Sequence, residues 1–242
     1  MARTKKFKKI RLHQEGTATM LWAGLSLLAL NTGLCLLTMN TSWKWVAWIV
    51  FVASLCIYGA IVNFFRCPIR VFDDETEGIV VAPADGKIVV CEEVEEQVYF
   101  HDKRLMISVF MSPLNVHANW FPIGGKVISV SHHRGNFHKA WLPKASIENE
   151  HADTLIETVD GQRVLVRQVA GAMARRIVTY PREGDTCYID EHLGFIKFGS
   201  RVDVYLPLTA TPLVHIGDKT VGNETKLATL TTGSSSSTPV EA

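Results

Sequence analysis

The sequence predicts a mainly β domain that is preceded by a pair of membrane-spanning helices. Two apolar segments occupy residues 17–65, and short apolar runs separated by Gly, Pro and Asp turns follow from about residue 70. Even spacing of such runs and turns is typical of an all-β barrel or sandwich. With 242 residues and a net charge of +1, the chain has room for one medium domain and this appendage, and we expect no nucleic-acid partner.

The first predicted element is a helical hairpin over residues 17–65. No charged residue occurs from Thr17 to Met39 or from Trp45 to Phe65, and about 20 helical residues cross a hydrocarbon core. A cleaved signal peptide would have a shorter apolar region and no second span, and a surface helix of a soluble protein would carry a polar face. We therefore predict that residues 17–65 anchor the chain in a membrane.

Basic residues flank both outer ends of this hairpin. They crowd residues 1–16, and Arg66 and Arg70 follow the second apolar segment. By the positive-inside rule, residues 1–16 form a cytoplasmic segment, and the domain that follows lies on the cytoplasmic face of the cell (inner) membrane.

Several short segments after residue 66 are candidate strands, because each is rich in β-branched or aromatic residues and is bounded by turn signals. They cover residues 78–81, 87–92, 105–110, 126–131, 154–157, 163–169, 175–178, 186–189, 195–198 and 202–206. Glycine-bearing strand pairs near residues 85–86 and 184–194 indicate a barrel-sandwich-hybrid-like domain over residues 66–230. A short helix is expected at residues 143–149, and residues 231–242 have too little apolar content to fold.

The bond between Gly199 and Ser200 is a candidate for self-cleavage. Glycine leaves its carbonyl unshielded, and a serine hydroxyl can attack it in an N-to-O acyl shift that replaces the amide by an ester. Elimination from that ester, followed by hydrolysis, would leave a pyruvoyl group derived from Ser200. A Gly-Ser pair alone is more often a turn or a strand glycine, so the neighbouring motifs decide its meaning.

Other motifs accompany this pair along the chain. They are VAPADGKI at residues 81–88, FMSPLNVHANWFP at 110–122, GNFHKA at 135–140, Asn149-Glu150 and VAG at 169–171. Together with Gly199-Ser200, the set resembles the phosphatidylserine decarboxylase family in its short, membrane-associated form. The resemblance implies a proenzyme that cuts itself into residues 1–199 and 200–242, which stay together as a heterodimer or a higher oligomer. The mature protein would decarboxylate phosphatidylserine to phosphatidylethanolamine and CO2.

The same resemblance implies that Asp85, His117 and Ser200 form the self-processing triad. A histidine held by a carboxylate is the usual base for a serine hydroxyl. Taken singly, Asp85 is a common turn residue and His117 a common structural histidine. Many family members carry a second histidine three residues after the first, whereas this chain has Trp120 there. Either His117 acts both in self-processing and in proton transfer during turnover, or another group, such as His138, takes one of these two roles.

The covalent pyruvoyl group on residue 200 would be the cofactor, in the electron-sink role that pyridoxal phosphate has elsewhere. Aromatic rings suit the membrane interface and cations suit a lipid phosphate. The candidate substrate residues of these kinds, with the histidine named above, are His138, Trp120, Phe137, Arg134 and Lys139. No metal site is expected, because the adjacent His132 and His133 point to opposite faces of a strand.

Three alternatives stay open. The substrate could be archaetidylserine or a related serine phospholipid. A membrane-tethered serine hydrolase could use Ser200, His117 and Asp85 on an external substrate, although it lacks a Gly-x-Ser-x-Gly elbow and predicts an intact chain. A non-catalytic hammerhead-type carrier would need a lysine at a hairpin tip, and Lys87 lacks the expected Met-Lys-Met order.

Overall fold

The structure is a computed structural model that describes residues 10–136, 145–171, 176–197 and 200–231. The chain divides into two compact units, Met1–Ile69 and Arg70–Ala242. Residues 66–69, which the sequence pattern assigned to the β-rich domain, fall in the first unit. They do so because β2 (Arg66–Pro68) pairs antiparallel with β1 (Ile10–Leu12).

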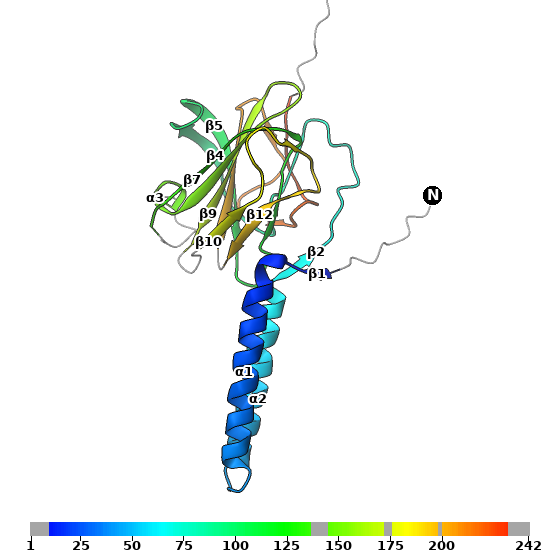
Figure 1. The fold of residues 1–242 in the computed structure, drawn as a ribbon. Helices are drawn as coiled ribbons and strands as arrows, with labels where there is room; N and C mark the ends of the chain where they lie inside the picture. Colours follow the sequence, from blue (N-terminus) through cyan, green and yellow to red (C-terminus); the bar gives the residue numbers. More distant parts are fainter. Residues whose placement is uncertain (1–9, 137–144, 172–175, 198–199, 232–242) are drawn as a thin grey trace, which may run out of the picture. The chain divides into compact units, whose positions relative to one another are not determined.

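The first unit consists of two long helices joined by a short turn (Figure 1). After a single 3-10 turn (Gln14–Gly16), α1 covers Thr17–Thr38 and α2 covers Lys44–Phe64. Both helices expose large apolar side chains along their length, and both are long and apolar enough to cross a membrane. These features indicate that the chain associates with a membrane.

A polar contact joins the two helices near their middle. Asn31 Nδ2 donates to Ser54 Oγ at 2.9 Å, and Ser54 Oγ donates in turn to the Val50 carbonyl at 2.7 Å. Asn31 Nδ2 also donates to the Leu27 carbonyl at 2.7 Å. Hydrogen bonds of this kind are a typical contact between helices in lipid, where no water competes for the polar groups.

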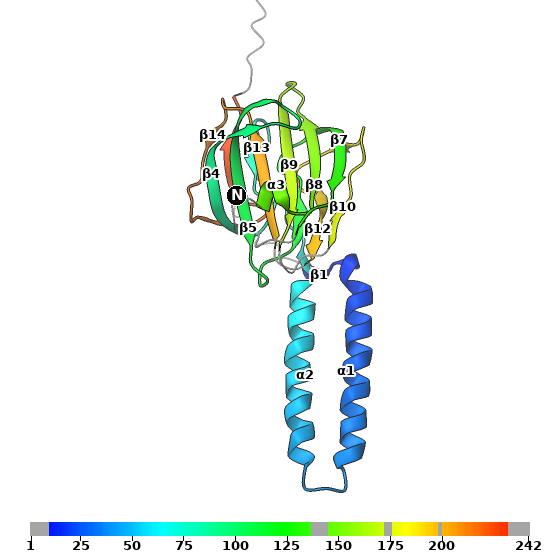
Figure 2. The same cartoon turned by 90° about the vertical axis from the view of Figure 1, so that its left-hand side faces the viewer.

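The second unit is built around an eight-stranded antiparallel sheet, which curls as Figure 2 shows. In spatial order its strands are β11 (Thr186–Cys187), β7 (Gly125–His133), β8 (His151–Glu157), β9 (Arg163–Ala170), β13 (Ser200–Leu206), β5 (Asp102–Met111), β4 (Gly86–Glu96) and β15 (Lys219–Thr220). The prediction of a mainly β domain after N-terminal helices is confirmed.

Two three-stranded sheets complete the unit. One has the order β10 (Arg176–Thr179), β12 (His192–Lys197), β6 (Ala118–Trp120), and the other β14 (Thr211–Pro212), β16 (Lys226–Thr229), β3 (Ile79–Val81). The short helix α3 (Ala145–Glu148) lies within the segment predicted to be helical. Strands β1, β2, β6, β14, β15 and β16, each of two to four residues, were not predicted.

Strand β13 lies between β9 and β5 and is buried on both faces. Val202, Val204 and Leu206 belong to the main core, and the alternate residues point to the other face, where Arg201 Nε lies 2.8 Å from Asp203 Oδ1. Ser200, the first residue of the strand, has the same parity as Val202. Its side chain therefore faces the main core.

Candidate active site

Ser200 is completely buried at the beginning of β13. Its partners across the sheet are Met111, at the end of β5, and Ala170, at the end of β9. The Ser200 hydroxyl donates to the Met111 Sδ at 3.2 Å. A thioether is a weak acceptor, so the hydroxyl keeps its proton in this arrangement. Gly199, on the other side of the predicted cleavage bond, lies outside the described residues.

His117 follows the end of β5, where Met111 lies beside Ser200. A tight turn leads to it, in which Asn115 Oδ1 accepts hydrogen bonds from the amide and the hydroxyl of Ser112 at 3.0 and 2.7 Å. His117 is fully buried, and its Nδ1 lies 2.9 Å from the Asn115 carbonyl oxygen. Facing a carbonyl, Nδ1 carries the proton and Nε2 carries the lone pair, which is the tautomer that a general base needs.

A buried chain of side-chain hydrogen bonds begins at Met111 and was not predicted from the sequence. Asn119 Nδ2 donates to the Met111 Sδ at 3.6 Å, and Asn119 Oδ1 accepts from Gln168 Nε2 at 2.7 Å. Gln168 Oε1 accepts from Thr179 Oγ1 at 2.9 Å. One signal in the sequence pointed to Asn119: it stands two residues after His117, so in an extended chain both side chains lie on one face.

Asp85, which precedes β4, is held by Arg70. The two guanidinium nitrogens Nη1 and Nη2 contact the two carboxylate oxygens, with 2.9 Å between Nη2 and Oδ2. The Gly222 amide also donates to Asp85 Oδ1, at 2.8 Å. Within the described part of the chain these are the hydrogen-bond partners of the Asp85 side chain. The predicted contact between Asp85 and His117 is not formed in this structure.

The model of the phosphatidylserine decarboxylase family matches residues 57–228 of the chain. The chain belongs to this family. It is 60% identical over 231 residues to the phosphatidylserine decarboxylase proenzyme of Bacteroides thetaiotaomicron, covering 95% of this chain and 100% of that protein. The proenzyme of the same name from Phocaeicola vulgatus is 59% identical with the same coverage, and that of Porphyromonas gingivalis is 49% identical over 91% of this chain.

The residues predicted to contact the substrate lie in different surroundings. Trp120 is only 1% exposed, with its ring centroid 5.1 Å from that of His192, so it is a buried ring and not one at a lipid-facing surface. Burial lowers the pKa of His192, which favours its neutral form. Arg134, after β7, is exposed. Three further candidates, His138, Phe137 and Lys139, lie outside the described residues.

A histidine cluster lies on β7 and β8, where the Nε2 atoms of His133 and His151 are each 3.9 Å from Asp153 Oδ2. Such a spacing is compatible with a metal ion. Both Asp153 oxygens, however, accept from Arg167, at 2.7 and 2.8 Å. The two imidazole rings also stack at 4.7 Å and 20°, and nearly parallel rings do not aim their lone pairs at one ion. We assign no metal to the cluster, and the absence of a metal site stays a prediction.

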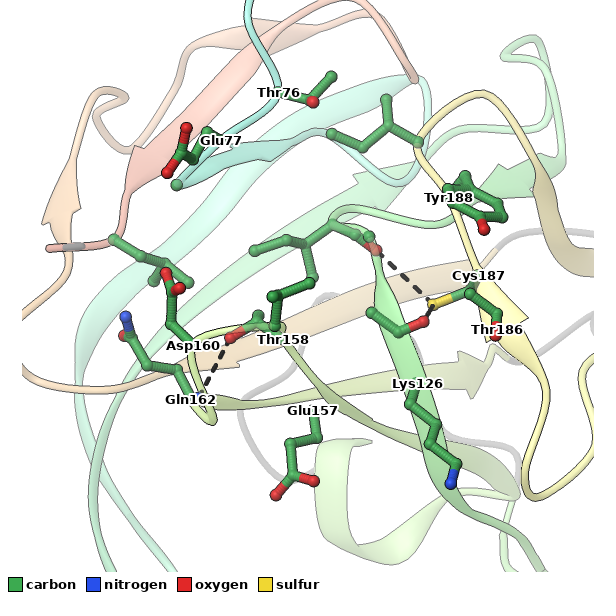
Figure 3. A pocket seen from close by; sticks show the side chains of 17 residues that line it. Thr76, Glu77, Lys126, Glu157, Thr158, Asp160, Gln162, Thr186, Cys187 and Tyr188 are labelled. Carbon is green, nitrogen blue, oxygen red and sulfur yellow. Dashed lines mark hydrogen bonds between the residues drawn. The ribbon is translucent and has the colours of Figure 1, made fainter. Parts of the chain in front are cut away.

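A cavity of about 690 Å³ opens in another part of this unit (Figure 3). Lys126, Glu157 and Tyr188 line it, together with Cys187, whose thiol lies 3.4 Å from the Gly125 carbonyl oxygen. Burial raises the pKa of Cys187 to about 11, so the thiol is protonated and is not a nucleophile. None of the predicted site residues is among the described residues around this cavity.

Proposed function

We propose that the chain is a proenzyme that cuts itself between Gly199 and Ser200 and then decarboxylates phosphatidylserine to phosphatidylethanolamine. The observation that carries the proposal is a completely buried serine at the head of β13, in a chain that matches the decarboxylase family over residues 57–228. The named relatives are phosphatidylserine decarboxylase proenzymes, which does not favour the hydrolase, the carrier or an archaeal-type lipid.

Cleavage begins when Ser200 Oγ attacks the carbonyl carbon of residue 199. The bond from that carbon to the Ser200 nitrogen breaks, the nitrogen takes up a proton, and an ester links the two residues. We assign His117 as the base that accepts the hydroxyl proton, because its Nε2 carries the lone pair. Elimination then frees a carboxylate at residue 199, and hydrolysis of the dehydroalanine consumes one water and releases ammonia.

The surroundings of Ser200 fit a pyruvoyl group. The side chain is fully buried with Met111 and Val202, both of the main core, so bulk water is kept from the group that Ser200 becomes. When present, this group offers a ketone to the substrate amine and an electron sink for the departing carboxylate. We assign His117, equally buried, to hold or deliver a proton at the same end of the sheet.

We extend the proposal to assembly and location. Residues 1–199 and 200–242 remain together as a heterodimer, which the position of β13 between two strands supports. Residues 17–65 anchor the protein in the cell (inner) membrane, and residues 66–230 act at its cytoplasmic face. The basic residues at both outer ends of the apolar segments support this orientation.

Intact mass spectrometry on the full chain in detergent tests the cleavage. The wild-type protein should give two chains, with a pyruvoyl group in place of serine at residue 200. Ser200→Ala should give one chain that releases no CO2 from phosphatidylserine. Ser108→Ala is the matched control, because Ser108 is an equally buried serine of the same sheet, and it should cleave normally. A single unmodified chain from active wild-type protein would refute the proposal.

A further inference from the structure

Two buried hydrogen-bond donors converge on one sulphur atom in the candidate site. The Ser200 hydroxyl and the Asn119 side-chain amide both donate to Met111 Sδ, at 3.2 and 3.6 Å. Ser200, Asn119 and Met111 are all completely buried. Because a thioether accepts hydrogen bonds only weakly, both donors lack a strong acceptor in the resting proenzyme. Buried donors are normally well paired, so an arrangement of this kind requires an explanation.

The orientation of the Asn119 amide is fixed from its oxygen side. Gln168 Nε2 donates to Asn119 Oδ1 at 2.7 Å, so the Asn119 nitrogen has to face Met111. The Gln168 amide is fixed in the same way, because Thr179 Oγ1 donates to its oxygen at 2.9 Å. A hydroxyl, a glutamine and an asparagine therefore set one direction of donation, which ends at Met111 Sδ, the atom to which Ser200 also donates.

The strands that carry these groups hold them in register. Gln168 pairs with Val202, two residues after Ser200, in the ladder between β9 and β13. Asn119 pairs with Gly194 in the ladder between β6 and β12. Gly194 allows this close approach, because a Cβ on it would lie 2.9 Å from Gln168 Nε2 and 2.1 Å from the Val178 carbonyl oxygen. The donor is thus built into two sheets and does not depend on a loop.

We propose that Asn119 is a catalytic residue of self-cleavage, whose side-chain N–H stabilises the oxyanion formed when Ser200 Oγ attacks the preceding carbonyl. Gln168 and Thr179 are positioning residues that keep this N–H aimed at the site. In the attack, the carbonyl π electrons move onto the oxygen as the new C–O bond forms, and the serine proton leaves to the base. A donor oriented in advance in a buried site stabilises such charge far more than water does. The inference rests on the proposed function and deepens it.

The first test compares two small side chains at position 119. Asn119→Ala removes the donor, and we expect cleavage of the full chain in detergent to slow by about 100-fold, within the range measured for loss of one oxyanion donor. Asn119→Ser is nearly as small but keeps an O–H, and it should cleave at least several-fold faster than Asn119→Ala. Equal rates for the two variants would overturn the proposal, because a packing role does not distinguish alanine from serine.

The second test reverses the direction of donation without removing Asn119. Gln168→Glu cannot donate to Asn119 Oδ1 and instead attracts Asn119 Nδ2, which turns the N–H away from Ser200. Cleavage should slow by more than 10-fold. Gln162→Glu is the matched control, because Gln162 lies after β8 and its Nε2 donates to the Thr231 carbonyl. Normal cleavage by folded Gln168→Glu would contradict the proposal. Thr179→Val leaves both amides in place and is a milder variant, in which cleavage should also slow.

Hydroxylamine identifies the step that Asn119 assists. It cleaves the ester that follows the acyl shift, so it speeds chain separation only where that ester has formed. In Asn119→Ala the ester forms slowly, and hydroxylamine should not restore the two chains. Rapid separation on its addition would place the defect after the attack and overturn the assignment. The proposed function is judged separately, by cleavage of the wild-type chain at residue 200.

Discussion

The side chains at the candidate site are not yet in the arrangement that cleavage requires. The Ser200 hydroxyl donates to a sulphur, the His117 Nδ1 proton faces the Asn115 carbonyl, and the Asp85 carboxylate is held by Arg70. The His117 tautomer suits a base, yet the Ser200 hydroxyl is not directed to a base and Asp85 does not contact His117. A rotation of the Ser200 side chain away from Met111 is therefore the first movement that cleavage requires.

Asn115→Ala tests how His117 is held. The variant loses two hydrogen bonds from Ser112 that close the turn, which should lower the free energy of unfolding by about 1–2 kcal/mol. The Asn115 carbonyl would no longer be fixed beside His117 Nδ1, so cleavage should slow several-fold. Both quantities can be followed on the full chain in detergent, by thermal unfolding and by mass spectrometry.

The matched control for this variant is Asp185→Ala. Asp185 Oδ2 accepts from the Arg182 amide at 2.8 Å, in a turn of the same kind outside the site. It should lose comparable stability and cleave at the normal rate. If both variants slow cleavage equally, general destabilisation explains the effect and His117 is not specifically positioned by its turn.

At the scale of the strand, the proposed cut lies directly before the first residue of β13, which is paired with a neighbouring strand on each side. Ser200–Leu206 pairs residue by residue with Leu105–Met111 of β5, and as far as Tyr205 with Leu165–Ala170 of β9. The buried ion pair between Arg201 and Asp203 adds a further constraint next to the cut. Cleavage therefore removes one covalent bond without removing the pairing that holds the new terminus.

We expect the two cleavage products to remain one particle. On size exclusion in mild detergent, residues 1–199 and 200–242 should elute together, and they should separate only in a denaturant, because β13 is buried on both faces. The uncleaved Ser200→Ala chain is the reference for the elution volume. Separate elution of the short product in mild detergent would show that the sheet opens on maturation.

The sequence predicted elements well where the pattern is long. Helices α1 and α2 begin and end within one residue of the uncharged segments, because an apolar run of that length matches a membrane-spanning helix. Strand β13 was expected over residues 202–206 and begins instead at Ser200. Pairing with Met111 and Ala170 fixes that start, and no local pattern contains this information.

The candidate site was predictable only in part for the same reason. Ser200 and His117 stand in recognisable motifs, whereas Gln168 meets Asn119 from 49 residues away and Thr179 meets Gln168 from 11 residues away. These contacts depend on sheet register. Arg70 was interpreted as a cation that flanks an apolar span, yet its side chain is 7% exposed and pairs with Asp85. A charge in a sequence does not reveal whether its partner is water or a carboxylate.

For the whole molecule, the proposed orientation makes a direct prediction about the two ends of the helical hairpin. The turn between α1 and α2 should face away from the cytoplasm, because the basic segments lie at the opposite end. In intact cells an impermeant maleimide should label Asn40→Cys. Glu15→Cys, at the other end of α1, should react only after the membrane is made permeable. The reverse pattern would place the decarboxylase unit on the outer face.

The burial of Ser200 inside its own polypeptide also has a consequence for supply. A cofactor that binds and leaves can be exchanged when it is damaged, and a cell can draw a fresh one from a vitamin pool. A group made from residue 200 cannot be replaced in this way, so damage to one carbonyl inactivates the whole protein molecule permanently. The rate at which a cell renews this step of lipid synthesis is then set by translation of new chains, each of which matures once.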